Sequence, residues 1–88
     1  MVTVLLSAGW AHRGQKSFEC HEGTVRDVIR EFVETYPVYR RRLLDDTGEP
    51  LTYYNVYLDG DLVEKADRSR VTARSDSTVA IVPPLAGG

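Results

Sequence analysis

The sequence predicts an α+β protein in which one main helix packs on one face of a mixed β-sheet. Val2, Val4 and Leu6 alternate with Thr3, Leu5 and Ser7, as in a strand with one buried face and a partly apolar outer face. One segment after Thr24 has apolar residues at helical spacing, and Asp59-Gly60 separates two β-prone segments. A chain of 88 residues supports one core, so we expect a single domain over 1–88 with a flexible tail at 83–88.

The N-terminal segment is expected to form an antiparallel hairpin. The strand at 2–6 is followed by turn residues and then by a second strand over 15–20, in which Phe18 and Cys20 share one side. The short connection between the two segments favours antiparallel pairing.

The helix is the most regular element in the sequence. Thr24 is expected to cap its N-terminus, and Pro37 is expected to end it. A further turn of helix is expected at 40–44. The apolar stripe consists of Val25, Val28, Ile29, Phe32, Val33 and Tyr36.

The C-terminal half is expected to add three strands. Residues 53–58 are rich in aromatic and branched side chains, and Asp59-Gly60 predicts a two-residue turn into a return strand at 61–63. Residues 64–78 are polar and show no pattern. The last strand, 79–82, is expected to pair near the first strand, and Pro83-Pro84 ends it because proline cannot extend a ladder.

Composition excludes several function classes. A formal net charge of -2 argues against a nucleic-acid-binding protein, which needs a basic face. No long apolar run or positively charged leader precedes the first strand, so membrane spanning and secretion are disfavoured. One cysteine cannot form an internal disulfide, and a reduced cytoplasm fits best.

The chain shows no pattern typical of an active site, a metal site or a bound cofactor. His12 and His21 are expected to be solvated or structural, and Cys20 to be a small core residue rather than a nucleophile. The basic run at 40–42 fits a solvated helix end better than a binding patch, and the acids at 45–49 fit a solvated loop.

The informative feature is the end of the sequence, Ala86-Gly87-Gly88. Two terminal glycines arise by chance in about one protein in 200. A Gly-Gly segment has the smallest cross-section of any peptide, so it can enter a narrow channel and present its carboxylate to a reagent there. Pro83-Pro84 would stiffen the base of this tail, whose reach is at most on the order of 20 Å.

These features resemble the ubiquitin-like β-grasp sulfur carriers of the ThiS/MoaD family, nearest the CysO-type carriers. The resemblance rests on the order of elements, the helix after Thr24 and the segment 79–88. Two further segments, 14–17 and 55–58, are most similar to the CysO-type carriers. One departure is the segment 75–78, where relatives commonly have an Asp-Gly turn.

The resemblance implies a carrier, not an enzyme. An E1-like adenylyltransferase and sulfurtransferase would use ATP to adenylate the Gly88 carboxylate, and sulfur would then replace AMP to give a thiocarboxylate. Gly87 would allow access to the activating site. The residues expected to contact partners are Gly87, Ala86, Leu85, Pro84 and Val82; Val82 fits core packing equally well.

The sulfur acceptor is left open by the resemblance. It could be a pyridoxal-phosphate-dependent cysteine synthase, with a metal-dependent peptidase releasing cysteine, or an enzyme that makes a thiosugar. Alternatives are the small subunit of molybdopterin synthase, a ubiquitin-like protein modifier, and an interaction module whose Gly-Gly ending is accidental.

Overall fold

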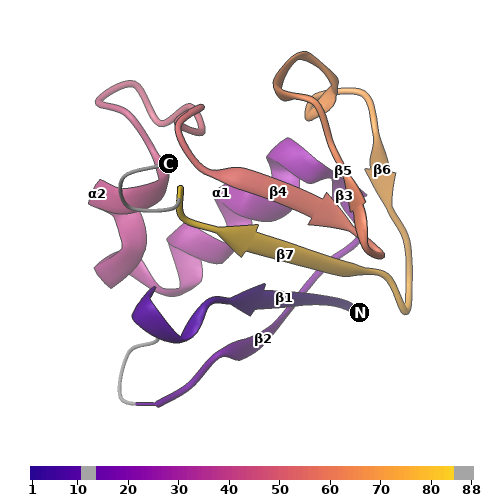
Figure 1. Ribbon diagram of the computed structural model, residues 1–88, viewed down its shortest axis with the longest axis horizontal. Coiled ribbons are helices and arrows are strands. Elements are labelled where there is room, and N and C mark those ends of the chain that lie inside the picture. The colour runs from indigo at the N-terminus through magenta and orange to yellow at the C-terminus, as the bar shows by residue number, and fades with distance from the viewer. Residues whose placement is uncertain (11–13, 85–88) are drawn as a thin grey trace.

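A computed structural model describes residues 1–10 and 14–84, which form a mixed sheet with one main helix, α1 (Val25–Thr35), on one face (Figure 1). The strands of this sheet are β1 (Val2–Leu6), β2 (Ser17–Cys20), β4 (Asn55–Leu58), β5 (Asp61–Leu62) and β7 (Thr78–Val82). Their order across the sheet is β2-β1-β7-β4-β5. The predicted α+β class is confirmed.

The last strand lies in the middle of the sheet. β7 pairs in parallel with β1, with Leu6 opposite Ile81, and antiparallel with β4, with Asn55 opposite Val82. β1 and β2 form the expected antiparallel hairpin. The expected neighbourhood of the first and last strands is therefore confirmed, and β7 is held by hydrogen bonds on both sides.

Helix α1 has the predicted cap and the predicted stripe. The Thr24 hydroxyl accepts a hydrogen bond from the Asp27 backbone N–H at 3.1 Å, which satisfies one of the free donors of the first turn. Five of the six stripe residues are buried in α1, and Tyr36 is half-buried after it. Pro37 begins a 3-10 turn, η2 (Pro37–Tyr39), and the expected extra helical turn follows as α2 (Arg40–Leu43).

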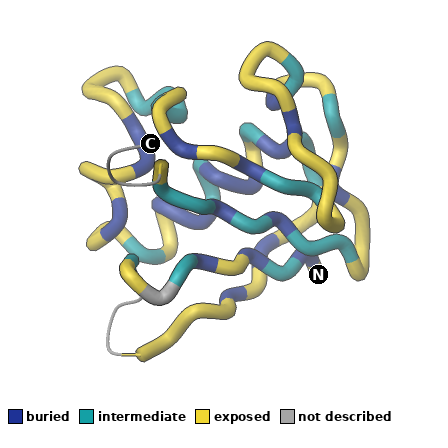
Figure 2. Tube along the Cα trace, viewed as in Figure 1, coloured by how far each residue is buried: buried dark blue, intermediate teal, exposed yellow. Residues whose placement is uncertain are grey.

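The core lies between α1 and the inner face of the sheet. Along β7, buried Val79 and Ile81 alternate with half-buried residues (Figure 2). The ring of Phe18 on β2 lies 4.9 Å from that of Phe32 on α1, between centroids, so the hairpin and the helix pack directly against each other. Cys20 is buried in the same core, as expected.

The strand predicted at 53–58 begins only at Asn55, so the predicted start is wrong by two residues. Tyr54 is fully buried and donates its hydroxyl to the carbonyl of Leu43 at 2.8 Å. The Tyr54 carbonyl accepts from Nη2 of Arg68 at 2.6 Å. The hydroxyl and the carbonyl of Tyr54 are thus used outside the sheet, which explains why aromatic β-propensity did not extend the strand.

Residues 64–78, which gave no sequence pattern, contain two further elements. They are a 3-10 turn, η3 (Lys65–Asp67), and β6 (Thr72–Ala73), which pairs with β3 (Gly23–Thr24) in a second sheet. A two-residue strand is too short to show alternation, so periodicity could not reveal this pair.

Two tight turns use positive backbone φ. Asp59 and Gly60 have φ of 50° and 89°, as a two-residue hairpin turn requires, so the predicted turn from β4 to β5 is confirmed. In the segment 75–78, Asp76 has φ of 73°, and the backbone N–H of Ser77 donates to the carbonyl of Arg74 at 2.9 Å. Aspartate tolerates this conformation, so the turn forms without glycine.

Candidate functional site

The base of the predicted tail is the C-terminal end of β7. Val82 is half-buried on the outer face of the sheet, Pro83 is half-buried and Pro84 is exposed. Val82 therefore belongs to the surface that α1 leaves uncovered rather than to the core between helix and sheet. The expected site residues Leu85, Ala86, Gly87 and Gly88 lie outside the described residues, and their roles stay predictions.

An apolar row crosses the outer face of the sheet beside this end. The strand register places Leu5, Ala80, Tyr57 and Leu62 opposite one another on β1, β7, β4 and β5. Leu5 is 39% exposed and Leu62 is 50% exposed. Exposed apolar side chains that share one face are typical of surfaces that bind other proteins.

Aromatic side chains flank the end of β7. Trp10 follows β1 in a short 3-10 turn, η1 (Ala8–Trp10), and Tyr53 precedes β4, so they extend the two strands that border β7 (Figure 1). The ring centroid of Trp10 lies 6.1 Å from those of both Tyr53 and Tyr54. The Tyr53 hydroxyl donates to the Arg42 carbonyl at 2.9 Å, which ties this cluster to α2.

The basic run lies on α2, at this same end of the sheet. Arg40, Arg41 and Arg42 are all exposed, and the guanidinium carbon of Arg42 lies 5.7 Å from the centroid of the Trp10 ring. The prediction that these arginines are solvated at a helix end is thus confirmed, and Arg42 in addition makes a cation–π contact. Arg42 therefore adds a positive charge to the aromatic cluster of Trp10, Tyr53 and Tyr54.

Cys20 is far from this site. It pairs with Val2, at the end of β1 opposite to the end of β7, and four residues of strand separate these ends by about 13 Å. Burial, with a smaller contribution from Glu31, raises the pKa of the Cys20 thiol to about 11. The thiol is therefore protonated at neutral pH, which agrees with a core role and not with a nucleophile.

The other polar candidates have structural contacts. Nδ1 of His21 lies 2.8 Å from Oε2 of Glu31, while His12 lies outside the described residues. Oδ1 of Asp45 accepts from the Thr47 hydroxyl at 2.7 Å and from two backbone N–H groups, which closes the loop after α2. Within residues 1–10 and 14–84, no group of three or more histidine, cysteine or carboxylate side chains is arranged to bind a metal.

Sequence reasoning did not single out the outer row or the aromatic cluster. The signal for the row was present, because Leu5 and Leu62 are apolar at positions that the strand alternation turns away from the core. Trp10 gave no signal, since its neighbours depend on the order of the strands.

In the described part of the chain, no helix has the length and apolar character needed to span a bilayer.

Known structures share this fold. A chain in the crystal structure of the Amycolatopsis orientalis BexX/CysO complex aligns with a TM-score of 0.82 and 24% identity, covering 100% of both chains. Small archaeal modifier protein 1 of Haloferax volcanii aligns with a TM-score of 0.76 and 22% identity, covering 96% of this chain and 97% of that one. These likenesses confirm the β-grasp fold.

A nearer relative in sequence is the Haloferax volcanii HVO 2177 protein, whose solution structure aligns with a TM-score of 0.74 and 30% identity. The alignment covers 99% of this chain and 85% of that one. No curated protein sequence matches the chain. The sequence profile of the ThiS family matches residues 8–88, which is nearly the whole chain. The protein therefore belongs to the ThiS family.

Proposed function

We propose that this chain is a sulfur carrier whose Gly88 carboxylate is adenylated and then converted to a thiocarboxylate. The observation that carries the proposal is the match to the ThiS family over residues 8–88, which includes the Gly87-Gly88 ending. In this role the protein is a co-substrate of partner enzymes rather than a catalyst, it binds no cofactor of its own, and it works in the reduced cytoplasm.

The chemistry proceeds in two steps on a partner, an E1-like enzyme. A Gly88 carboxylate oxygen attacks the α-phosphorus of ATP, pyrophosphate leaves, and a mixed anhydride with AMP forms. Sulfide then attacks the carbonyl carbon, and AMP leaves with the oxygen that linked it. If the sulfur comes from a persulfide, a further thiol must cleave the resulting S–S bond. Activation is needed because a free carboxylate is unreactive toward nucleophiles.

The fold supports this role through the position of β7. Because β7 is the central strand, the base of the tail is anchored on both sides, and Pro83 and Pro84 cannot continue the ladder. The partner would bind Val82, Pro84 and the outer row from Leu5 to Leu62, while Leu85, Ala86, Gly87 and Gly88 enter its active site. A glycine at 87 avoids side-chain contacts in a narrow channel.

The sulfur acceptor would be a biosynthetic synthase. A carrier can supply several acceptors, since each needs only the tail and the docking surface. A thiosugar synthase and a pyridoxal-phosphate-dependent cysteine synthase both fit, the latter with a metal-dependent peptidase that releases cysteine. The similar chain from Amycolatopsis orientalis comes from a crystallised complex of BexX with CysO, which supports delivery by direct docking.

A protein modifier is the second candidate. It is favoured by the structural likeness to a chain named small archaeal modifier protein 1. In that role the activated Gly88 carbonyl would be transferred to lysine amines of other proteins, so conjugates of higher mass would form. A permanent small subunit of molybdopterin synthase would instead copurify with a larger subunit.

The proposal is tested by ATP–pyrophosphate exchange with an E1-like enzyme. Intact protein should support exchange, whereas deletion of Gly88 or the substitution Gly87→Val should abolish or strongly reduce it. Ala66→Val, at an exposed position of η3 away from the end of β7, is a control for added side-chain bulk (Figure 1). Urea unfolding of each variant checks that the fold is retained. Equal exchange by intact and truncated protein would contradict the proposed role of Gly88.

A further inference from the structure

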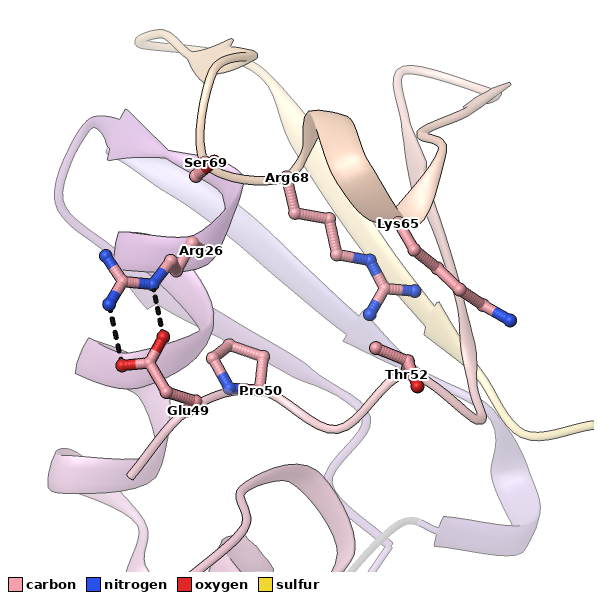
Figure 3. A pocket seen from close by; sticks show the side chains of 7 residues that line it. All are labelled: Arg26, Glu49, Pro50, Thr52, Lys65, Arg68 and Ser69. Carbon is pink, nitrogen blue, oxygen red and sulfur yellow. Dashed lines mark hydrogen bonds and ion pairs between the residues drawn. The ribbon is translucent and has the colours of Figure 1, made fainter. Parts of the chain in front are cut away.

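A pocket of about 330 Å³ opens on the surface between three segments of the chain. Its walls come from the first turn of α1, the loop before β4 and the region of η3, as Figure 3 shows. This volume is at the lower end of the range for small-molecule sites. The lining residues are Arg26, Glu49, Pro50, Thr52, Lys65, Arg68 and Ser69.

Arg68 is the unusual member of this set, because it is a buried cation. Only 4% of the Arg68 surface is exposed to solvent. Nη1 donates to the Leu51 carbonyl at 3.0 Å, Nη2 donates to the Tyr54 carbonyl at 2.6 Å, and the guanidinium carbon lies 5.0 Å from the centroid of the Tyr54 ring. Two carbonyls therefore position the group.

These contacts leave both a donor and a charge uncompensated. Within residues 1–10 and 14–84, Nε of Arg68 is buried and donates to no acceptor, and no carboxylate is within ion-pair distance of the guanidinium. Burial lowers the pKa of Arg68, because desolvation penalises the charged form. A buried charge and a buried donor both cost free energy unless an anion or acceptor meets them.

The surroundings of Arg68 are also positive. Lys65 lines the same pocket and has no ion pair in the described part of the chain. Arg26 is paired with Glu49 through two hydrogen bonds of 2.7 and 2.6 Å. Three cations and one carboxylate give the pocket a formal charge of +2, in a chain whose net charge is -2.

We propose that this pocket binds a tetrahedral oxyanion, phosphate or sulfate. Arg68 would supply a buried positive charge at the wall, the Lys65 ammonium would bind an oxygen of the anion, and Thr52 and Ser69 line the same space. Arg26 contributes positive charge while Glu49 holds its guanidinium at the wall (Figure 3). The proposal does not depend on the chemistry of the Gly-Gly tail.

A purely structural role for Arg68 accounts for less. The bonds to Leu51 and Tyr54 explain why a guanidinium joins the loop before β4 to η3. They do not use Nε, and they leave the guanidinium without a carboxylate partner in a pocket that Lys65 also lines. An oxyanion in the pocket would offset the charges of Arg68 and Lys65 at once.

The test is a phosphate titration of the full chain followed by NMR at constant ionic strength. The probes are the Nε–H signal of Arg68 and the backbone amide signals of Thr52 and Ser69. Inorganic phosphate and sulfate are titrated separately, and chloride is the ionic control. Saturable shifts of the Arg68 Nε–H with phosphate or sulfate, and none with chloride, are expected.

Two variants that change the charge of the pocket in opposite directions make the test specific. Lys65→Gln removes a cation from the pocket and should weaken phosphate binding about fivefold, whereas Glu49→Gln removes the competing carboxylate and should strengthen it by a similar factor. Lys16→Gln and Glu19→Gln change the net charge equally at exposed positions of the β1–β2 hairpin region and should have no effect.

Several results would overturn the proposal. Linear shifts that are the same for phosphate and chloride would show that no site exists. Equal affinities for Lys65→Gln and Lys16→Gln would show that the attraction is a property of the whole chain. Saturable amide shifts with an unchanged Arg68 Nε–H would mean that Arg68 serves only as a structural link.

Discussion

Replacing Ile81 by alanine tests the placement of β7 directly before the tail. Ile81 is fully buried, and its substitution removes three carbons from the core. At about 0.8 kcal/mol per buried carbon, the transfer term is roughly 2.4 kcal/mol, and the remaining cavity raises the loss to about 3 kcal/mol. An 88-residue domain has a total stability of about 4–13 kcal/mol, so the variant should fold with a much smaller margin.

The assay is urea unfolding followed by circular dichroism. With an m-value of about 1.5 kcal/mol/M, the midpoint for Ile81→Ala should fall by about 2 M. The matched control is Val82→Ala, on the outer face, which should cost under about 1 kcal/mol because this side chain is already partly in water. Similar losses for the two variants, or a loss below about 1 kcal/mol for Ile81→Ala, would refute the assigned register.

Three other perturbations separate structural from functional residues. Hydrogen bonds, the largest effect being that from the Thr47 hydroxyl, hold the pKa of Asp45 below its ordinary value of 3.8. The ionised Asp45 therefore stabilises the fold above that value, and this stabilisation is lost as the pH falls through the folded-state pKa. Asp45→Asn should flatten the acid side of a plot of unfolding midpoint against pH. Cys20 should resist iodoacetamide in the folded protein, and Cys20→Ala should leave sulfur loading unchanged by mass spectrometry, because the thiol is buried with a pKa of about 11. Leu62→Ser should weaken activation by the E1-like partner without loss of stability, whereas Val38→Ser, at another exposed apolar position, should not affect activation.

The helix and the first hairpin could be predicted because their signals are local. Six apolar residues at helical spacing between Thr24 and Pro37 predict a helix, and the alternation in 2–6 predicts which face of β1 is buried. The turn at Asp59-Gly60 is equally local, since positive φ at both residues selects this residue pair.

The remaining features depend on contacts between distant segments. Tyr54 resembles a strand residue in sequence but is held by Leu43 and Arg68, and no local pattern reveals either partner. The pairing of β3 with β6 involves two residues on each side, too few for a period. The aromatic cluster around Trp10 likewise requires β1 and β4 to flank β7, which only the strand order establishes.

Arg68 shows the same limit for the oxyanion pocket. In sequence it is one of several charged residues in a polar segment, with nothing to distinguish it from exposed Arg70. Its burial results from the packing of η3 against the loop before β4. The Gly-Gly ending is the opposite case, because its interpretation depends on the sequence and on membership of the ThiS family.

The proposed function depends on sulfur loading at Gly88. The most direct measurement is the intact mass of the protein after incubation with an E1-like enzyme, ATP and a sulfur donor, followed by mass analysis of the C-terminal peptide. We expect a mass increase equal to the replacement of one oxygen by sulfur, located at Gly88 and absent without ATP. An unchanged mass with an enzyme that demonstrably adenylates the carrier would contradict sulfur transfer through Gly88.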